Sequence, residues 1–525
     1  MDMRNLKLNR WAGLVSGVVC LLLLTGTLTY GWRVHQAPDS RIAPVLREEA
    51  AFLRANPQYD YEIPVIIKVR RDLFQETDGR HRNLSQRDAK KVRSLALIHS
   101  YAAKVRASQL PSLADSPLVE YVTLDARVYP TNSHSPLSPS VDMANARSVI
   151  GANQVDANGK GVTVAVFDSG IDSHQDLRRK ERLKASIDFT SGTPEPMYLS
   201  KDTDDFGHGT HVAGIIGGNG RISKGLQSGV APGVSFLDMK VVGKEGWGYT
   251  SNLIKAIEWV VEHQQKYDVR VANMSIGHPA YEEYFNDPLC LAAEEMVAKG
   301  IVTVVSAGNL GRTDEHPKIW GGIYSPGTDP TVITVYPVNT HGTLTHQDDS
   351  ATSYGSRGPS IDGLFKPDLS APGNRIVSLI ANESTLKREY PELRTDGQYF
   401  TMSGASMATA FVSGTVALML EENPDLNPNL VKLILLLTAV KLQEPSMLEQ
   451  GNGLLNAKTA VEIASVLDVD EKVMTEAISP LWMLDGEEVW AGGAFAYGDQ
   501  VIYSRLIEAS DDPLFWGNGV FWTDR

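Results

Sequence analysis

The stretch GVTVAVFDSGID, residues 161–172, decides the fold. Its apolar run from Val162 to Phe167 is short and uninterrupted, which predicts a strand buried on both faces. Similar runs recur at Ser235–Val241, Val269–Met274, Ile301–Ser306 and Thr331–Val335. Helical patterns are expected at His211–Gly217, Thr250–His263, Leu291–Lys299 and Met407–Glu421. The alternation predicts an α/β domain over residues 141–466 with a doubly wound, mostly parallel sheet.

Asp168 follows the first strand directly, at the sheet edge where open α/β folds build their sites. The segment DTDDFGHGTHVAGIIGG then offers two histidines. His208 stands at a loop-to-helix junction and is the candidate for chemistry, whereas His211 begins the helix proper and is expected to be structural.

A serine and an asparagine stand at two further junctions of this kind. Ser406, in TMSGASMATAFVSGTVALML, begins an apolar helix, where unpaired amides and a positive dipole favour a developing oxyanion. Asn309 ends the strand segment IVTVVSAGN, and its side-chain amide is a candidate second donor.

The segments DSGID, GHGTHVAG, NMSIG, SAGN and SGASMA stand in the order found in the subtilases, and the resemblance covers about residues 143–465. It implies a subtilisin-like fold and a catalytic triad of Asp168, His208 and Ser406, with Asn309 in the oxyanion hole. The implied activity is that of a serine endopeptidase that hydrolyses proteins through an acyl-enzyme.

The same resemblance predicts how a polypeptide substrate binds. NMSIG and GWGY are similar to the two family segments that hold an extended peptide by backbone pairing. It implies substrate-binding roles for Ser275, Ile276, Gly277, Gly246 and Gly248. Trp247 either narrows the subsites before the cut or is an ordinary surface aromatic, and the sequence leaves both interpretations open.

Residues 34–140 are expected to form a separate α+β unit and a linker. A strand is predicted at Pro64–Val69, a helix at Ala89–Val105 and a strand at Val119–Val128. The unit resembles the inhibitory propeptide of the subtilases, which assists folding and blocks the cleft. Self-cleavage is therefore expected between about Val128 and Ser140, within the Pro- and Ser-rich linker.

The two ends of the chain differ from this body. Residues 1–33 hold three basic residues before an uncharged run from Trp11 to Trp32, which predicts a cleaved signal peptide or a retained membrane anchor. The protein is thus expected to be secreted or anchored outside the cytoplasm. Residues 467–525 hold four of the nine Trp residues and predict a short β-rich extension.

Composition limits the partners and cofactors. A net charge of −14 argues against nucleic-acid binding, and Cys20 and Cys290 leave no expected disulfide in the mature chain, with Cys290 a buried small hydrophobe. No cofactor is required. Calcium is compatible with Asp176 in SHQDL, although a solvated surface carboxylate is the preferred interpretation. The alternative function is a catalytically inactive binding or envelope adhesion protein on the same fold.

Overall fold

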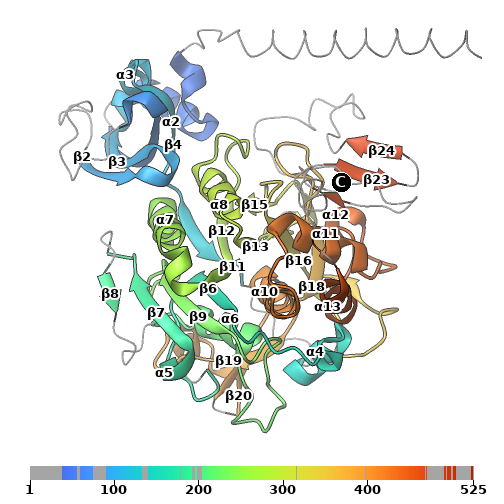
Figure 1. Cartoon of the computed structure of the whole chain (residues 1–525). Coiled ribbons are helices and arrows are strands. Elements are labelled where there is room, and N and C mark those ends of the chain that lie inside the picture. The colour runs from blue at the N-terminus through green and yellow to red at the C-terminus, as the bar shows by residue number, and fades with distance from the viewer. Residues whose placement is uncertain are drawn as a thin grey trace, which may run out of the picture.

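The quoted stretch forms a buried strand in a nine-stranded sheet of the computed structural model (Figure 1). The strands are β6 (Thr163–Asp168), β7 (Leu183–Asp188), β8 (Glu195–Met197), β9 (Ser235–Lys240), β11 (Val269–Met274), β13 (Val302–Ser306), β16 (Ile333–Asn339), β17 (Ser350–Ala351) and β18 (Leu369–Pro372). Their order is β17-β16-β13-β11-β6-β9-β7-β8, with β18 also paired to β16. The inner pairs are parallel, and β8 and β17 are antiparallel edges. The predicted doubly wound sheet is confirmed.

The structure describes most of the chain between residues 38 and 469. The described residues are 38–55, 60–74, 90–132, 140–177, 179–191, 195–197, 204–314, 316–396, 398–467, 469, 490–491, 494–497, 500–503 and 522–523. The leader, residues 1–33, lies outside them. Within these ranges, no helix is both long enough and apolar enough to cross a bilayer.

Helices cover both faces of the sheet. Alternate residues of β6 face opposite ways, so Val164 and Val166 join one apolar core while Ala165 and Phe167 join another. The first core contains α4 (Met143–Val149), α6 (His208–Gly217), α10 (Ala405–Glu422), α11 (Pro428–Thr438) and α13 (Ala457–Val466). The second contains α7 (Thr250–Tyr267) and α8 (Pro288–Ala298). A strand buried on both sides holds its carboxyl end rigidly, which matters for Asp168.

An N-terminal unit precedes this domain. Its antiparallel sheet has the order β2-β3-β1-β4, and two helices cover one face. The elements are α2 (Pro44–Ala55), β1 (Glu62–Val69), β2 (Lys90–Leu95), β3 (Ser100–Arg106), α3 (Leu110–Asp115) and β4 (Val119–Leu124).

The helix predicted at Ala89–Val105 is wrong, because β2 and β3 occupy that stretch. Tyr101 and Ala103 pack in the core under the unit's own helices, whereas Ala102 packs on the opposite face. This alternation has the period of a strand, and the apolar residues on both faces hid it in the sequence.

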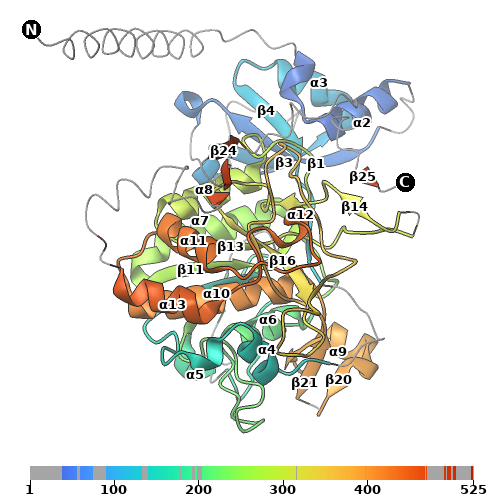
Figure 2. The ribbon, with the colours of Figure 1, turned by 90° about the vertical axis from the view of Figure 1, so that its right-hand side faces the viewer.

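The open face of the N-terminal sheet is closed by the α/β domain. Ile66, Leu95, Ile98 and Ala102 belong to the same apolar core as α7 and α8. Figure 2 shows the N-terminal unit lying across one end of the larger domain. The two units therefore share one hydrophobic core.

Short strands complete the described structure. A four-stranded sheet has the order β10-β5-β12-β15, and a three-stranded one β19-β21-β20. Their bounds are β5 (Arg127–Pro130), β10 (Gly248–Tyr249), β12 (Ile276–Pro279), β15 (Tyr324–Ser325), β19 (Ile376–Leu379), β20 (Arg394–Thr395) and β21 (Tyr399–Met402). The tail contributes β22 (Trp490–Ala491), β23 (Ala494–Tyr497) and β24 (Gln500–Tyr503), while β25 (Trp522–Thr523) pairs with β14 (Ile319–Trp320).

Candidate active site

An aspartate and a histidine meet where β6 ends and α6 begins. Asp168 is the last residue of β6, and His208 is the first residue of α6. The Nδ1 atom of His208 lies 2.8 Å and 2.9 Å from the two carboxylate oxygens of Asp168, and both side chains are buried. Among the described residues, the Nε2 atom of His208 has no hydrogen-bond partner. The imidazole is thus oriented at one nitrogen and free at the other.

The loop before His208 is held by a carboxylate that the sequence reasoning missed. Asp204 accepts hydrogen bonds from the Ser169 hydroxyl at 2.8 Å and the Gly207 amide at 2.6 Å. It also accepts from the Thr210 amide at 2.9 Å and the Thr210 hydroxyl at 2.6 Å. Burial raises the pKa of Asp204, and these four donors oppose the rise. The signal was present in the sequence as an aspartate three residues before Gly207.

His211 lies on the same helix as His208 but in a different environment. Its ring is buried, and its Nε2 atom lies 3.0 Å from the Phe400 carbonyl. Burial lowers the pKa of His211 to about 3, so the ring stays neutral at physiological pH. This agrees with the structural role expected for it.

Ser406 lies in the first turn of α10, with its hydroxyl group turned toward two neighbours. It donates to the Ser275 carbonyl at 2.8 Å, and its Oγ atom lies 2.9 Å from the Thr131 hydroxyl oxygen. The backbone amide of Ser406 donates to the carbonyl of Thr131 at 3.2 Å. The positive end of α10 therefore already holds a carbonyl oxygen of the chain itself.

Asn309 stands beside the same helix end. Its Oδ1 atom accepts from the Ala405 amide at 3.1 Å, which fixes the orientation of the side chain. Within the described part of the chain, its Nδ2 donor is buried and unpaired. A buried donor of this kind is costly unless a ligand or a reaction intermediate uses it.

Two strands of the α/β domain hold β5 as a third strand between them. Val128 pairs with Gly248 on one side, while Tyr129 and Pro130 pair with Gly277 and Ile276 on the other. The Thr131 amide extends this pairing by donating to the Ser275 carbonyl at 3.1 Å. An extended segment is thus bound mainly through its backbone, from Arg127 to Thr131.

Two glycines beside this segment have no room for a side chain, Gly404 because of the segment itself and Gly248 because of the chain just before it. At Gly404, φ is +152°, and a Cβ atom would lie 2.2 Å from the Thr131 carbonyl oxygen. At Gly248, a Cβ atom would lie 2.0 Å from the Val241 carbonyl oxygen. Gly246, which the sequence grouped with Gly248, lies instead in the preceding turn, where its amide donates to Gly243.

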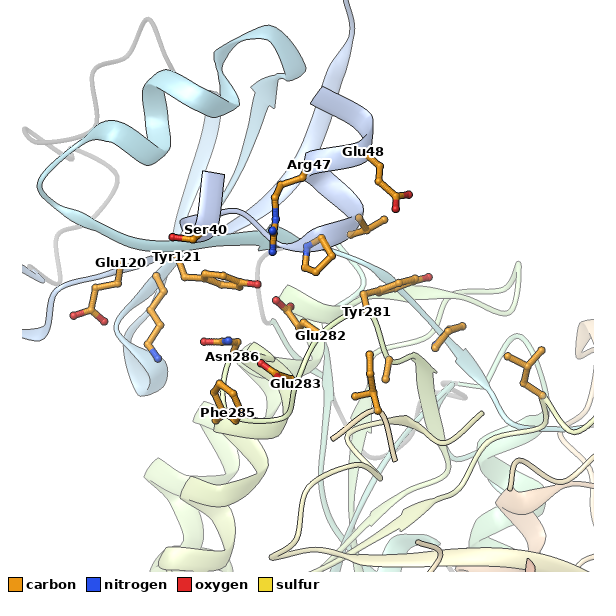
Figure 3. A pocket seen from close by; sticks show the side chains of 17 residues that line it. Ser40, Arg47, Glu48, Glu120, Tyr121, Tyr281, Glu282, Glu283, Phe285 and Asn286 are labelled. Atoms are coloured by element: carbon orange, nitrogen blue, oxygen red, sulfur yellow. The ribbon is translucent and has the colours of Figure 1, made fainter. Parts of the chain in front are cut away.

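Two carboxyl groups at the junction between the units were also missed. Asp125 accepts from the Ser251 amide at 2.8 Å and hydroxyl at 2.7 Å, at the amino end of α7, and burial raises its pKa to about 6. Glu282 accepts from the Thr123 hydroxyl and lines a cavity of about 1040 Å³ between the units (Figure 3). Burial, then the nearby Asp287 carboxylate, raises the pKa of Glu282 to about 8.

Asp176 is not the solvated carboxylate that the sequence suggested, because it is fully buried. Its Oδ1 atom accepts from the Ile222 amide at 2.9 Å, and its Oδ2 atom accepts from the Tyr399 hydroxyl at 2.7 Å. Each oxygen therefore already accepts a hydrogen bond from the protein, which leaves Asp176 fewer lone pairs for a calcium ion. The described residues contain no group of three acidic, histidine or cysteine side chains placed to hold a metal ion.

Cys290 is buried, as expected, at the amino end of α8. Burial raises the pKa of its thiol well above the usual range, so the thiolate is disfavoured. The thiol takes no part in the site described above.

Comparisons with known proteins identify the family and several relatives of this chain. A model of the subtilase family matches residues 159–453. Serine protease AprX of Bacillus subtilis (strain 168) is 37% identical over 62% of this chain and 71% of its own length. The thermostable alkaline protease of Halalkalibacterium halodurans is 32% identical over 58% of this chain and 68% of its own. Among solved structures, fervidolysin from Fervidobacterium pennivorans has a similar fold, with a TM-score of 0.57 and 22% identity, over 77% of this chain and 61% of that one.

Proposed function

The chain belongs to the subtilase family and is a serine endopeptidase, and we propose that Asp168, His208 and Ser406 are its catalytic triad. The bond between His208 Nδ1 and Asp168 supports this assignment, because it leaves Nε2 free to accept a proton. His211, whose Nε2 atom already lies against the Phe400 carbonyl, is not available for that role. The family membership disfavours an inactive binding protein.

The reaction begins with the Ser406 hydroxyl turning from the Ser275 carbonyl toward His208. The Oγ atom attacks the carbonyl carbon of the substrate while Nε2 of His208 takes its proton. Asp168 holds the imidazole in position and stabilises its cation. The proton then passes to the leaving amine, and water hydrolyses the acyl-enzyme by the same route in reverse.

Two donors stabilise the negative oxygen formed in this attack. They are the backbone amide of Ser406 and the Nδ2 atom of Asn309. The Thr131 carbonyl supports the assignment of the Ser406 amide, because its oxygen already accepts a hydrogen bond from that amide at 3.2 Å. The unpaired, buried Nδ2 atom supports the second.

The single observation that carries the proposal is the backbone pairing of the chain's own residues 127–131 with β10, β12 and Ser275. We propose that residues 34–131 are an inhibitory propeptide and that the enzyme cuts its own Thr131–Asn132 bond. Pairing with β10 and β12 presents this bond to Ser406, and the shared core keeps the unit docked after the cut. Polypeptides bound in the same manner are the substrates.

Export is proposed on the basic and apolar pattern of residues 1–33, in the precursor of an extracytoplasmic protease. Cleavage at Thr131–Asn132 separates the protease from this leader, whether it is a signal peptide or an anchor. The catalytic residues need no cofactor for the steps above.

The test is to express the full chain as wild type, Ser406→Ala and Ser403→Ala, and to determine the mass and amino-terminal sequence of each product. Ser403→Ala is a matched control, because it removes a nearby buried hydroxyl that accepts a hydrogen bond from the backbone amide of Arg375 and lies outside the proposed triad. We expect the wild type and the control to yield a product that begins at Asn132, and Ser406→Ala to stay joined at that bond. Equal processing of all three would assign the cut to another protease, and a uniform absence of processing would overturn the propeptide proposal.

A further inference from the structure

An arginine of the bound segment rests on an aromatic ring of the α/β domain. The guanidinium carbon of Arg127 lies 4.2 Å from the ring centre of Trp247. Trp247 in turn packs edge to face against Tyr249, with ring centres 5.4 Å apart and an interplanar angle of 85°. A guanidinium at this distance over an indole face is attracted by the ring's quadrupole.

The register of β5 fixes which substrate position this contact reads. Arg127 pairs with Tyr249, and Val128 with Gly248. Val128 and Pro130 are buried, whereas Arg127 and Tyr129 are exposed on the other side of the strand. Arg127 is the fifth residue before the Thr131–Asn132 bond. The Trp247 ring therefore contacts the side chain at that position, on the solvent-exposed side of β5.

The surroundings favour a positive charge there. Trp247 and Tyr249 border a cavity of about 340 Å³ that is more acidic than basic. Asp205 is paired with Lys240 at 2.6 Å and Glu245 with Lys244 at 3.8 Å, which leaves Asp188 unmatched by a lysine in the cavity lining. Within the described part of the chain, no carboxylate forms an ion pair with Arg127. The Trp247 ring is therefore the main partner of the Arg127 guanidinium group.

We propose that Trp247 forms a subsite that selects arginine or lysine at the fifth position before the scissile bond. The inference rests on the proposed substrate position of residues 127–131 and extends it to other polypeptides. Because the contact is with a ring face, it favours a cationic side chain over an apolar one of equal length.

The test uses processed enzyme obtained from the full chain and two peptides. One has the sequence of residues 126–134, and in the other methionine replaces the arginine at 127. We expect kcat/KM to be about two- to fivefold higher for the arginine peptide, the size of one exposed cation–π contact. Trp247→Ala should remove this preference, and Trp247→Phe should keep part of it.

The methionine peptide serves as the reference within each enzyme, because the preference is the ratio of the two kcat/KM values and does not depend on how far Trp247→Ala changes cleavage in general. Equal kcat/KM for the two peptides with wild-type enzyme, or an arginine preference that survives Trp247→Ala, would overturn the inference while leaving the proposed function intact. Product masses separate the two proposals, because cleavage at a bond other than Thr–Asn would overturn the substrate register itself.

Discussion

Binding of the cleaved N-terminal unit to the α/β domain should weaken as the pH rises from about 5 to 8, and Glu282 should carry most of this dependence. Its carboxyl group faces Thr123 and Tyr121 of β4, with Lys68 of β1 and Asp287 also close enough to shift its pKa. Burial in the junction raises that pKa to about 8. Within the described part of the chain, its Oε2 atom has no hydrogen-bond partner, so an ionised form is poorly stabilised there.

The sign follows from comparing the docked and separated states. Once the unit leaves, Glu282 regains water and a pKa near its ordinary value of about 4.3. The docked state therefore holds one extra proton between about pH 4.5 and 8, and binding is strongest below this window. Each pH unit within it weakens binding by up to about tenfold, or roughly 10² to 10³ in all. Asp125, with its pKa raised to about 6, adds to the lower half of the window.

The assay is size-exclusion chromatography of the processed protein at several pH values, which reports the fraction of the N-terminal unit still bound. Glu282→Gln keeps a neutral partner for Thr123 and should flatten most of the dependence. Glu283→Gln alters an exposed neighbour and should leave the dependence unchanged. The same steep dependence in Glu282→Gln as in the wild type would refute the reasoning.

Three substitutions in the site have distinct expected effects. Asn309→Ala should lower kcat by about 10² to 10³, the range known for this donor in subtilisin, with KM little changed in steady-state assays of the processed enzyme. A kcat within threefold of the wild type would remove Asn309 from the mechanism. Gly404→Ala should slow self-processing strongly, since its Cβ atom would lie 2.2 Å from the Thr131 carbonyl oxygen. A gel time course measures the rate of processing, and an unchanged rate would contradict this expectation. Asp204→Ala, in a Ser406→Ala background, should lower the free energy of unfolding by about 3 kcal/mol because it strands buried donors; a loss below 1 kcal/mol in urea denaturation would contradict that account.

The sequence predicted best those features that depend on neighbours in the chain. Asp168, His208 and Ser406 each lie at a junction between a strand or loop and the next element, and such junctions have local signatures. Asp125 and Glu282 escaped notice because their partners lie 126 and 159 residues away, and no local pattern marks them. Asp204 is intermediate, since its partners are near but its role depends on the folded loop.

The errors have the same physical origin. The segment 89–105 was expected to be helical, whereas its apolar residues lie on both faces of a sheet that is covered on both sides. Asp176 was expected in solvent because nothing in its local sequence reveals Tyr399, its partner 223 residues away. Burial by remote segments decides both cases.

The shared core has a consequence for how the protein is made. Ile66, Leu95, Ile98 and Ala102 rest on α7 and α8 as parts of one interior, so the junction is a core cut in two and not a contact between finished surfaces. Under the proposed propeptide role, the N-terminal unit, which is synthesised first, would offer these apolar side chains to α7 and α8 as they fold. The proposed cleavage and release would then expose apolar surface on both parts, so we expect the separated α/β domain to refold poorly without the N-terminal unit.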